Sequence, residues 1–174
     1  LKNREKRENN LKKILDLTYP IYIESKSVTS FMDVFKTHTD ATRVFVVTDE
    51  NVWKMHDQVF KAFKNEMECF VVRVEPGEQS KSLETYEKVV SHLLNAGIKR
   101  DDVLIAFGGG VVGDLTGFIA ATLFRGISFI QIPTTIIAQV DSSIGSKVGI
   151  NTSTGKDLIG AFKDPLFVYM YVPF

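Results

Sequence analysis

The triplet Gly108-Gly109-Gly110 stands where the apolar run 103–107 stops, and Asp114 follows shortly after it. Glycine at a strand-to-helix junction lets the backbone come close to a ligand, and the free N–H groups of the following helix can hold an anion. Asp114 can hydrogen-bond such a ligand or cap the helix. These residues predict a phosphate-binding turn, with an ordinary tight strand–helix turn as the alternative interpretation.

The same glycines match the pattern GxGxxG at Gly108, Gly110 and Gly113. The usual dinucleotide fingerprint follows the first strand of its unit and has an acidic residue at the end of the next strand. Here the glycines follow a later predicted strand, and the next strand ends at Pro133. The pattern is therefore not the ordinary dinucleotide fingerprint.

A second polar cluster contains Asp141, Lys147 and Lys156, with both lysines in glycine-containing segments that we expect to be loops. An ionised aspartate accepts hydrogen bonds from the diols of a sugar. The STGK tetrapeptide that ends at Lys156 is not a P-loop, because Asp157 follows the lysine and Ile150 stands where that motif has its first glycine. The cluster predicts a site for a phosphorylated, hydroxyl-rich substrate beside a nucleotide.

Two pairs of polar residues follow apolar runs, the first pair directly and the second in a loop. The first pair is Asp49 and Asn51, and the second is Glu78 and Lys81. Acidic side chains after a strand accept hydrogen bonds from ribose hydroxyls. The alternatives are an ordinary turn or cap for the first pair and a solvated loop before a helix for the second.

Hydroxyl groups follow the strand predicted at 128–132. Thr134 and Thr135 can cap a helix or face a cofactor, and Asp141 stands beside Ser142 in a stretch that can also be a helix C-terminal turn. Arg125, which precedes that strand, can pair bidentately with phosphate. An arginine at a helix end is also favoured by the helix dipole, which is the alternative interpretation.

Alternating strands and helices must position these side chains. Apolar runs predict strands at 21–23, 43–48, 69–74, 103–107, 128–132 and 165–174, and helical spacing predicts helices at 27–35, 52–63, 82–96 and 113–123. Ser27 and Ser82 are candidate helix caps. The alternation indicates an α/β fold with a Rossmann-like, mostly parallel sheet and flanking helices. Ligands of such sheets bind at the carboxyl ends of the strands, where the polar residues occur.

The 174 residues suit one domain with a substantial core. We expect residues 1–17 to form a short amphipathic helix or tail and residues 18–174 to form the α/β domain. The chain stops just after an apolar strand, which suggests a piece of something longer.

Composition argues against several classes of protein. Basic and acidic residues number 21 each, unlike the one-sided charge of nucleic-acid-binding proteins. No uninterrupted apolar stretch reaches about 18 residues, so we expect no membrane span. Cys69, the only cysteine, is expected to be a buried thiol, and the lack of an internal disulfide is consistent with a cytoplasmic location. His38, His56 and His92 lack partners at metal-ligand spacing, so no metal site is expected.

Taken together, the motifs resemble the N-terminal half of the 3-dehydroquinate synthase family. Their order and separations match from about residue 18 to the end. The motifs are Asp49-x-Asn51, Pro76-Gly77-Glu78-x-x-Lys81, Gly108-Gly109-Gly110-Val111-Val112-Gly113-Asp114, Arg125-Gly126, Pro133-Thr134-Thr135, Asp141-Ser142-Ser143-Ile144-Gly145-x-Lys147 and Gly155-Lys156. The helical C-terminal domain of this family is expected to be absent.

The resemblance implies that residues 18–174 are an NAD-binding domain. The residues implied to bind NAD are, from the adenosine end, Asp49, Asn51, Glu78 and Lys81, then Gly109, Gly110, Val111 and Asp114 around the pyrophosphate, then Thr134, Thr135, Asp141, Ser142 and Lys156. Asp141 and Lys147 are implied to reach the substrate, with Lys147 near its phosphate. Arg125 is implied to reach the partner subunit's site in a homodimer.

The resemblance also implies a reaction of the shikimate pathway, which leads to chorismate and the aromatic amino acids. The family converts the sugar phosphate 3-deoxy-D-arabino-heptulosonate 7-phosphate into 3-dehydroquinate and phosphate, formally as a lyase, while NAD takes a hydride and returns it. A divalent metal, zinc or sometimes cobalt, polarises the substrate in this family. Its ligands lie in the second domain, so the chain alone is expected to bind no catalytic metal and to be inactive.

Two residues depart from the family pattern. Ser146 stands where the family usually has Gly, and Asp157 stands where it usually has Asn. Asp157 would repel a substrate phosphate unless it is protonated or turned away. A related sugar phosphate cyclase and a non-catalytic nucleotide-binding module are the alternative functions.

Overall fold

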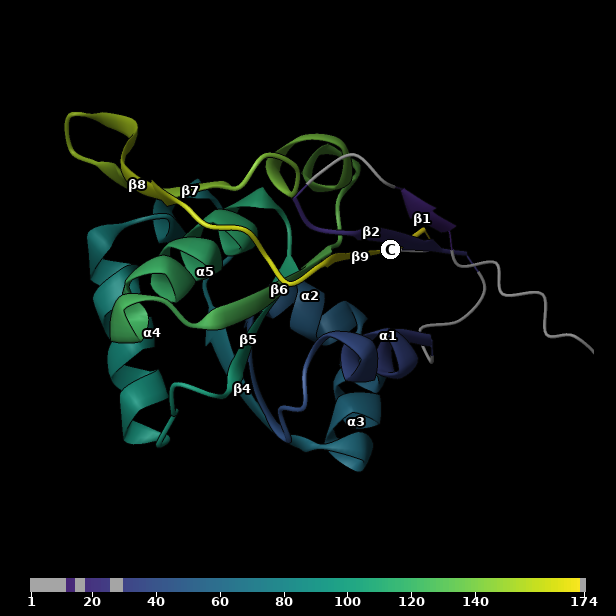
Figure 1. Cartoon of the computed structure of the whole chain (residues 1–174). Helices are drawn as coiled ribbons and strands as arrows, with labels where there is room; N and C mark the ends of the chain where they lie inside the picture. Colours follow the sequence, from purple (N-terminus) through teal and green to yellow (C-terminus); the bar gives the residue numbers. More distant parts are fainter. Residues whose placement is uncertain (1–11, 15–17, 26–29, 173–174) are drawn as a thin grey trace, which may run out of the picture.

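The computed structural model describes residues 12–14, 18–25 and 30–172. Its centre is a seven-stranded sheet with the strand order β1-β2-β9-β6-β5-β3-β4 (Figure 1). Every neighbouring pair is parallel except β1 with β2. The strands are β1 (Lys12–Ile14), β2 (Ile21–Glu24), β3 (Arg43–Asp49), β4 (Glu68–Val74), β5 (Val103–Gly108), β6 (Ser128–Pro133) and β9 (Val168–Tyr171).

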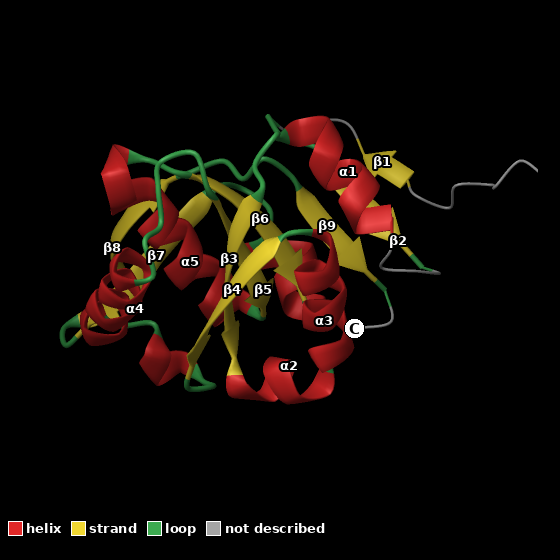
Figure 2. Ribbon diagram, turned by 90° about the horizontal axis from the view of Figure 1, so that it is seen from below, coloured by secondary structure: helices red, strands yellow, loops and turns green. Residues whose placement is uncertain are grey.

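Helices cover both faces of this sheet, as Figure 2 shows. The sheet therefore lies between two layers of helices, and the side chains of β3 contact both. Val44 and Val46 pack among the helices of one face, whereas Phe45 and Val47 pack among those of the other. Successive strand residues point to opposite faces, so a strand covered on both sides is a continuous apolar run. The first face carries α1 (Ser30–His38), α2 (Glu50–Met55) and α3 (Asp57–Glu66), and the second carries α4 (Leu83–Asn95) and α5 (Gly110–Thr122).

A separate antiparallel hairpin lies over α5 (Figure 1). It consists of β7 (Lys147–Thr152) and β8 (Gly155–Phe162). Val148 and Ile150 of β7 are buried in the same cluster as the inner residues of α5. Gly117 permits this contact, because a Cβ there would lie 2.3 Å from Val148 Cγ1. The prediction that Lys147 and Lys156 lie in loops was therefore wrong, since each belongs to a strand of this hairpin.

The predicted α/β fold with a mostly parallel sheet is confirmed, and some boundaries differ. The helix predicted at 52–63 is divided at His56, whose φ of −124° and ψ of 31° are not helical. The last predicted helix begins at Gly110 rather than Gly113. No helix among the described residues has the length and apolar character needed to cross a bilayer.

The N-terminal segment also differs from the prediction. Lys12–Ile14 form β1, an antiparallel partner of β2, where a helix or tail was expected. The rest of the segment 1–17 lies outside the described residues, as does the candidate cap Ser27. The helix predicted at 27–35 is described from Ser30 onward and continues to His38.

Candidate functional site

The carboxyl ends of β3, β4, β5 and β6 meet at one edge of the sheet, and a cavity of about 790 Å³ opens there, which we call the strand-end cavity. Loops that follow adjacent parallel strands are neighbours in space, so their polar residues converge. The cavity lining includes most of the residues predicted to bind a cofactor: Asp49, Asn51, Glu78, Lys81, Gly109, Gly110, Val111, Asp114, Thr134 and Thr135.

The glycine turn forms one wall of the strand-end cavity. β5 ends at Gly108, and Gly109 is the N-cap of α5 without any side-chain hydrogen bond to the helix. The first N–H groups of a helix have no partner within it, so those of α5 are available to an anion. A Cβ on Gly110 would lie 3.0 Å from Ser142 Oγ, and one on Gly109 would lie 3.4 Å from Thr135 Cγ2. A side chain at either position would therefore crowd Thr135 or Ser142.

Asp49 caps a helix and also lines the strand-end cavity. Its Oδ1 atom accepts hydrogen bonds from the backbone N–H groups of Asn51 and Val52, each at 2.9 Å, and so caps α2. The same carboxylate lines the strand-end cavity. Because both capping bonds fall on Oδ1, the cap makes no use of Oδ2.

Lys81 is buried, with 5% of its surface exposed, so the solvated-loop interpretation is wrong for this residue. Its Nζ atom lies 2.5 Å from Asp114 Oδ2 and also contacts Asp157 Oδ1. Burial lowers the pKa of Lys81, but hydrogen bonds and charges from the two carboxylates outweigh it and raise that pKa above its ordinary value. Burial raises the pKa of Asp114, and the Lys81 ammonium opposes this shift.

The loop that holds Lys81 also leads into α4. Ser82 Oγ accepts a hydrogen bond of 3.2 Å from the Thr85 backbone N–H, which confirms Ser82 as a helix cap. The lysine thus stands one residue before a fixed helix start, which limits how far its backbone can move.

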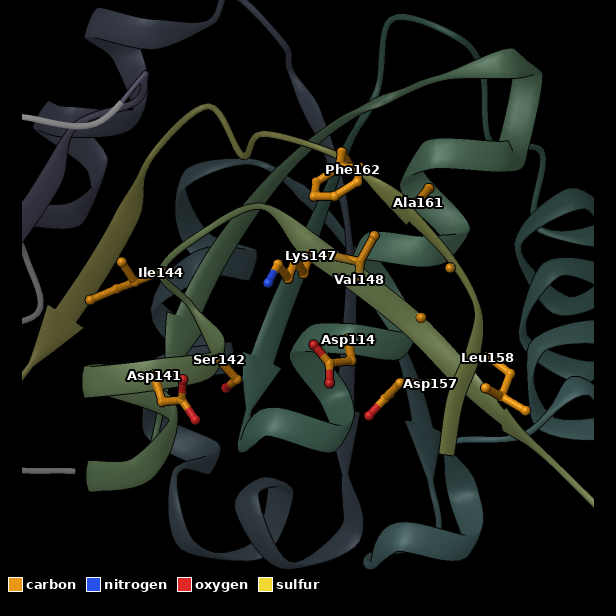
Figure 3. Close-up of a pocket in the computed structure, with 12 residues that line it drawn as sticks. Asp114, Asp141, Ser142, Ile144, Lys147, Val148, Asp157, Leu158, Ala161 and Phe162 are labelled. Atoms are coloured by element: carbon orange, nitrogen blue, oxygen red, sulfur yellow. The ribbon is translucent and has the colours of Figure 1, made fainter. Parts of the chain in front are cut away.

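A second cavity of about 540 Å³ lies between α5 and the hairpin, and we call it the hairpin cavity (Figure 3). Asp141 and Ser142 enter it from a short π-helical turn (Ala138–Ser142), and Lys147 enters it from β7. Asp114 lines both cavities, so the two are neighbours. The residues predicted to meet a substrate are thus brought together, but Asp141 and Ser142 lie beside the strand-end cavity rather than in its lining.

Two predicted site residues line neither cavity. Lys156 is exposed on β8, and its Nζ atom lies 3.6 Å from Glu78 Oε1. Arg125 is exposed in the turn after α5, at the opposite end of that helix from Gly110, with a φ of 64°. The structure does not bring Arg125 to the cavities of its own chain.

Sequence reasoning missed Asn151 of β7. Its Nδ2 atom donates to Glu78 Oε1 at 2.7 Å, its backbone N–H donates to the Lys81 carbonyl at 2.8 Å, and its Oδ1 atom accepts from the Asp157 N–H at 3.0 Å. One available signal was a polar residue that directly follows the apolar stretch of β7. Nothing in its spacing pointed to these three partners.

The two departures from the family pattern share one backbone feature. Ser146 has a φ of 62° and Asp157 has a φ of 56°. Glycine and asparagine, the residues usual at these positions, are those that adopt this left-handed region most readily. Asp157 also turns its carboxylate to Lys81, so its charge faces a cation.

Cys69 is only partly buried, contrary to the prediction of a buried thiol. Burial nonetheless raises its pKa to about 11, while the charge of Lys64 opposes the shift. Across residues 12–14, 18–25 and 30–172, no group of three or more His, Cys, Asp or Glu side chains is placed to hold a metal ion.

A family model described as 3-dehydroquinate synthase N-terminal matches residues 71–174. The chain belongs to the 3-dehydroquinate synthase family. The 3-dehydroquinate synthase of Caldanaerobacter subterraneus subsp. tengcongensis is 41% identical over 155 residues, which cover 88% of this chain and 44% of that protein. The 3-dehydroquinate synthase of Bartonella quintana is 51% identical over 126 residues, covering 71% and 33%. The chain thus spans less than half the length of these relatives.

Solved structures of related enzymes share the fold. A structure of 2-deoxy-scyllo-inosose synthase complexed with carbaglucose-6-phosphate, NAD⁺ and Co²⁺ has a TM-score of 0.81 at 25% identity, over 92% of this chain and 44% of that one. A structure of 2-epi-5-epi-valiolone synthase from Streptomyces hygroscopicus subsp. jinggangensis, with NAD⁺ and Zn²⁺ bound, has a TM-score of 0.78 at 22% identity, over 91% and 44%. These similarities confirm the Rossmann-like architecture.

Proposed function

We propose that this chain is the NAD-binding domain of a 3-dehydroquinate synthase, which converts 3-deoxy-D-arabino-heptulosonate 7-phosphate into 3-dehydroquinate and phosphate. One observation carries the proposal. In a chain of this family, the loops after four adjacent parallel strands bring a glycine-lined helix start and several carboxylates into one cavity of about 790 Å³. That combination suits a phosphate-containing, hydroxyl-rich cofactor.

The strand-end cavity offers distinct groups to a ribose and to the pyrophosphate of NAD. Asp49 and Glu78 supply carboxylates that accept hydrogen bonds from ribose hydroxyls, and Asn51 lies beside them. The N–H groups of Gly110 and Val111 open α5 and suit the pyrophosphate. Bound NAD supplies reversible hydride transfer at a substrate carbon. The chain's own contribution is to bind the cofactor and direct its reactive end toward the hairpin cavity.

The hairpin cavity suits the sugar phosphate. Lys147 brings an ammonium group that attracts a phosphate, and Asp141 brings a carboxylate that accepts a hydrogen bond from a substrate hydroxyl. Asp157 also lines this cavity, and its contact with Lys81 offsets its repulsion of a phosphate. We therefore assign Asp141 and Lys147 to substrate binding and catalysis.

The divalent metal implied by the family, zinc or cobalt, has no ligand set among the described residues. We propose that its ligands lie outside this chain, and no role assigned here involves the metal. On this account the chain alone releases no phosphate from the substrate, and an assay for inorganic phosphate tests that expectation.

We further propose that the complete enzyme is a cytoplasmic homodimer in which Arg125 serves the partner's site. Its exposure at the far end of α5 supports this role, because it lies away from the cavities of its own chain. Light scattering and an activity assay, applied to the complete enzyme and to its Arg125→Ala variant, test the dimer and the role of Arg125 separately. The variant is expected to lose activity and to remain a dimer.

A related sugar phosphate cyclase is the second candidate. The similarity to 2-deoxy-scyllo-inosose synthase favours it, since that structure has a TM-score of 0.81. Identity of 41% to a curated 3-dehydroquinate synthase, against 25% to that cyclase, supports the first candidate. A non-catalytic nucleotide-binding module is the third candidate. Unlike the other two, it would give no turnover even when joined to a catalytic domain.

A chimera tests the proposal. The chain replaces the matching N-terminal region of the Caldanaerobacter enzyme, and phosphate release is measured with 3-deoxy-D-arabino-heptulosonate 7-phosphate and with glucose 6-phosphate. Turnover of the heptulosonate alone supports the proposal, and turnover of the hexose phosphate alone favours a different cyclase. If the chimera does not assemble, calorimetry of NAD with the chain itself tests NAD binding, because a nucleotide-binding domain binds NAD without turnover.

A further inference from the structure

Asn151 is where the hairpin meets the loop that carries Glu78 and Lys81. It lies at an irregularity of β7, where the register with β8 shifts between Ile150 and Thr152. There it forms an isolated parallel bridge with Ser82, and its N–H donates to the Lys81 carbonyl. The hairpin is thus fixed to the loop after β4 through the backbone of this residue.

The side chain of Asn151 extends that connection in two directions. Its Nδ2 atom donates to Glu78 Oε1 at 2.7 Å, and its Oδ1 atom accepts from the Asp157 N–H at 3.0 Å. The first bond orients a carboxylate that lines the strand-end cavity. The second holds the backbone of Asp157 at a φ of 56°, from which its carboxylate contacts Lys81.

The amide suits this place better than any other side chain of its size. Glu78 requires a donor and the Asp157 N–H requires an acceptor, and an asparagine amide supplies one of each. A carboxylate of the same shape satisfies the second partner but repels the first. The charged groups around the amide are Glu78, Lys81, Asp114, Lys156 and Asp157.

We propose that Asn151 is a positioning residue of the nucleotide site. It orients Glu78 toward the bound nucleotide and holds Asp157 against Lys81, so that the hairpin and the strand-end cavity keep one relative placement. The nucleotide part of this inference rests on the proposed NAD-binding function.

Asn151→Asp tests the contact with Glu78, because it keeps the size of the side chain and the acceptor for the Asp157 N–H. NAD affinity, measured by calorimetry on the 174-residue chain, is expected to fall roughly tenfold at pH 8. Asn65→Asp, which adds the same charge on the exposed surface of α3, is the matched control and should bind NAD as the wild type does.

A double variant in which donor and acceptor change places tests the same contact. In Glu78→Gln, the new amide can donate to the carboxyl introduced by Asn151→Asp. Adding Asn151→Asp to Glu78→Gln is therefore expected to weaken NAD binding less than about threefold. A residue that merely supports the fold would give the same loss in both backgrounds. Equal losses, or an unchanged affinity of the Asn151→Asp single variant, would overturn the proposal.

Hydrogen exchange of the Asp157 amide gives a readout that does not depend on the nucleotide. Asn151→Ala removes the acceptor, so this amide is expected to exchange at least about tenfold faster, whereas Asn151→Asp should leave it protected. If the wild-type chain binds no NAD, the proposed function fails, and this exchange rate alone decides whether Asn151 positions Asp157. Unchanged exchange in Asn151→Ala would overturn the positioning role.

Discussion

The ammonium of Lys81 lies 2.5 Å from Asp114 Oδ2 and so joins the loop after β4 to α5. The lysine side chain is 6% exposed and that of the aspartate is 18% exposed, so water screens the pair only weakly. Both residues line the strand-end cavity. The ion pair therefore fixes the relative position of two elements that line one cavity.

Lys81→Met is expected to lower the free energy of unfolding by about 3 kcal/mol, because it leaves Asp114 without its nearest cation in a largely buried place. Urea unfolding followed by circular dichroism measures the change. Lys88→Met is the control, since the pair of Lys88 with Glu84 is exposed, and it should leave the midpoint nearly unchanged. Similar midpoints for the two variants would show that the Lys81 pair has no special role in stability.

The raised pKa of Lys81 predicts how this stability depends on pH. A lysine whose pKa is higher in the folded state stabilises the fold fully below its unfolded value, and the contribution is lost as the pH rises through the folded value. Above neutral pH, the difference in unfolding free energy between the wild type and Lys81→Met should therefore be constant up to about pH 10 and shrink beyond it. A difference that persists unchanged at pH 12 would contradict the assignment.

Gly110→Ala is expected to weaken NAD binding at least about tenfold with little loss of stability. A Cβ at this position would lie 3.0 Å from Ser142 Oγ and would crowd the helix start to which we assign the pyrophosphate. Calorimetry gives the affinity and thermal unfolding gives the stability. Ser91→Ala, on the exposed side of α4, is the control substitution. Undiminished affinity in Gly110→Ala would remove the glycine turn from the nucleotide site.

Cys69 is expected to react slowly with iodoacetamide in the native protein. Its pKa of about 11 leaves about a hundredfold less thiolate at pH 8 than the ordinary value of 9.0 does. Mass spectrometry of a time course, with the urea-unfolded chain as the reference, measures the ratio. Native and unfolded chains that react at the same rate would show that the thiol is not protected by burial.

The sequence patterns predicted the central fold well because each strand and helix could be identified from residues close together along the chain. The strands at 43–48 and 103–107 are apolar on both faces, and that pattern has few interpretations other than a covered parallel sheet. The convergence of Asp49 and Glu78 followed from topology, since parallel strands end at one edge. The hairpin was missed because Gly155, Lys156 and Asp157, at the start of its second strand, are typical of a loop.

The contacts within the site depended on long-range geometry that residue spacing does not contain. Lys81 was expected in an exposed or ligand-binding loop, yet it is covered by Asp114 and by Asp157 of the hairpin. Asn151 was missed for the same reason, since Glu78 and Lys81 are far from it along the chain and meet it only when the hairpin packs against the loop after β4. Side chains that hold one loop against another are visible only in the folded chain.

A crystal structure of the chain with NAD would show where the nucleotide binds. We expect it in the strand-end cavity, with its pyrophosphate at the N–H groups of Gly110 and Val111 and a ribose at Asp49 or Glu78. A nucleotide bound on another face of the sheet, or a glycine turn that makes no contact with its phosphates, would rule out the proposed NAD site.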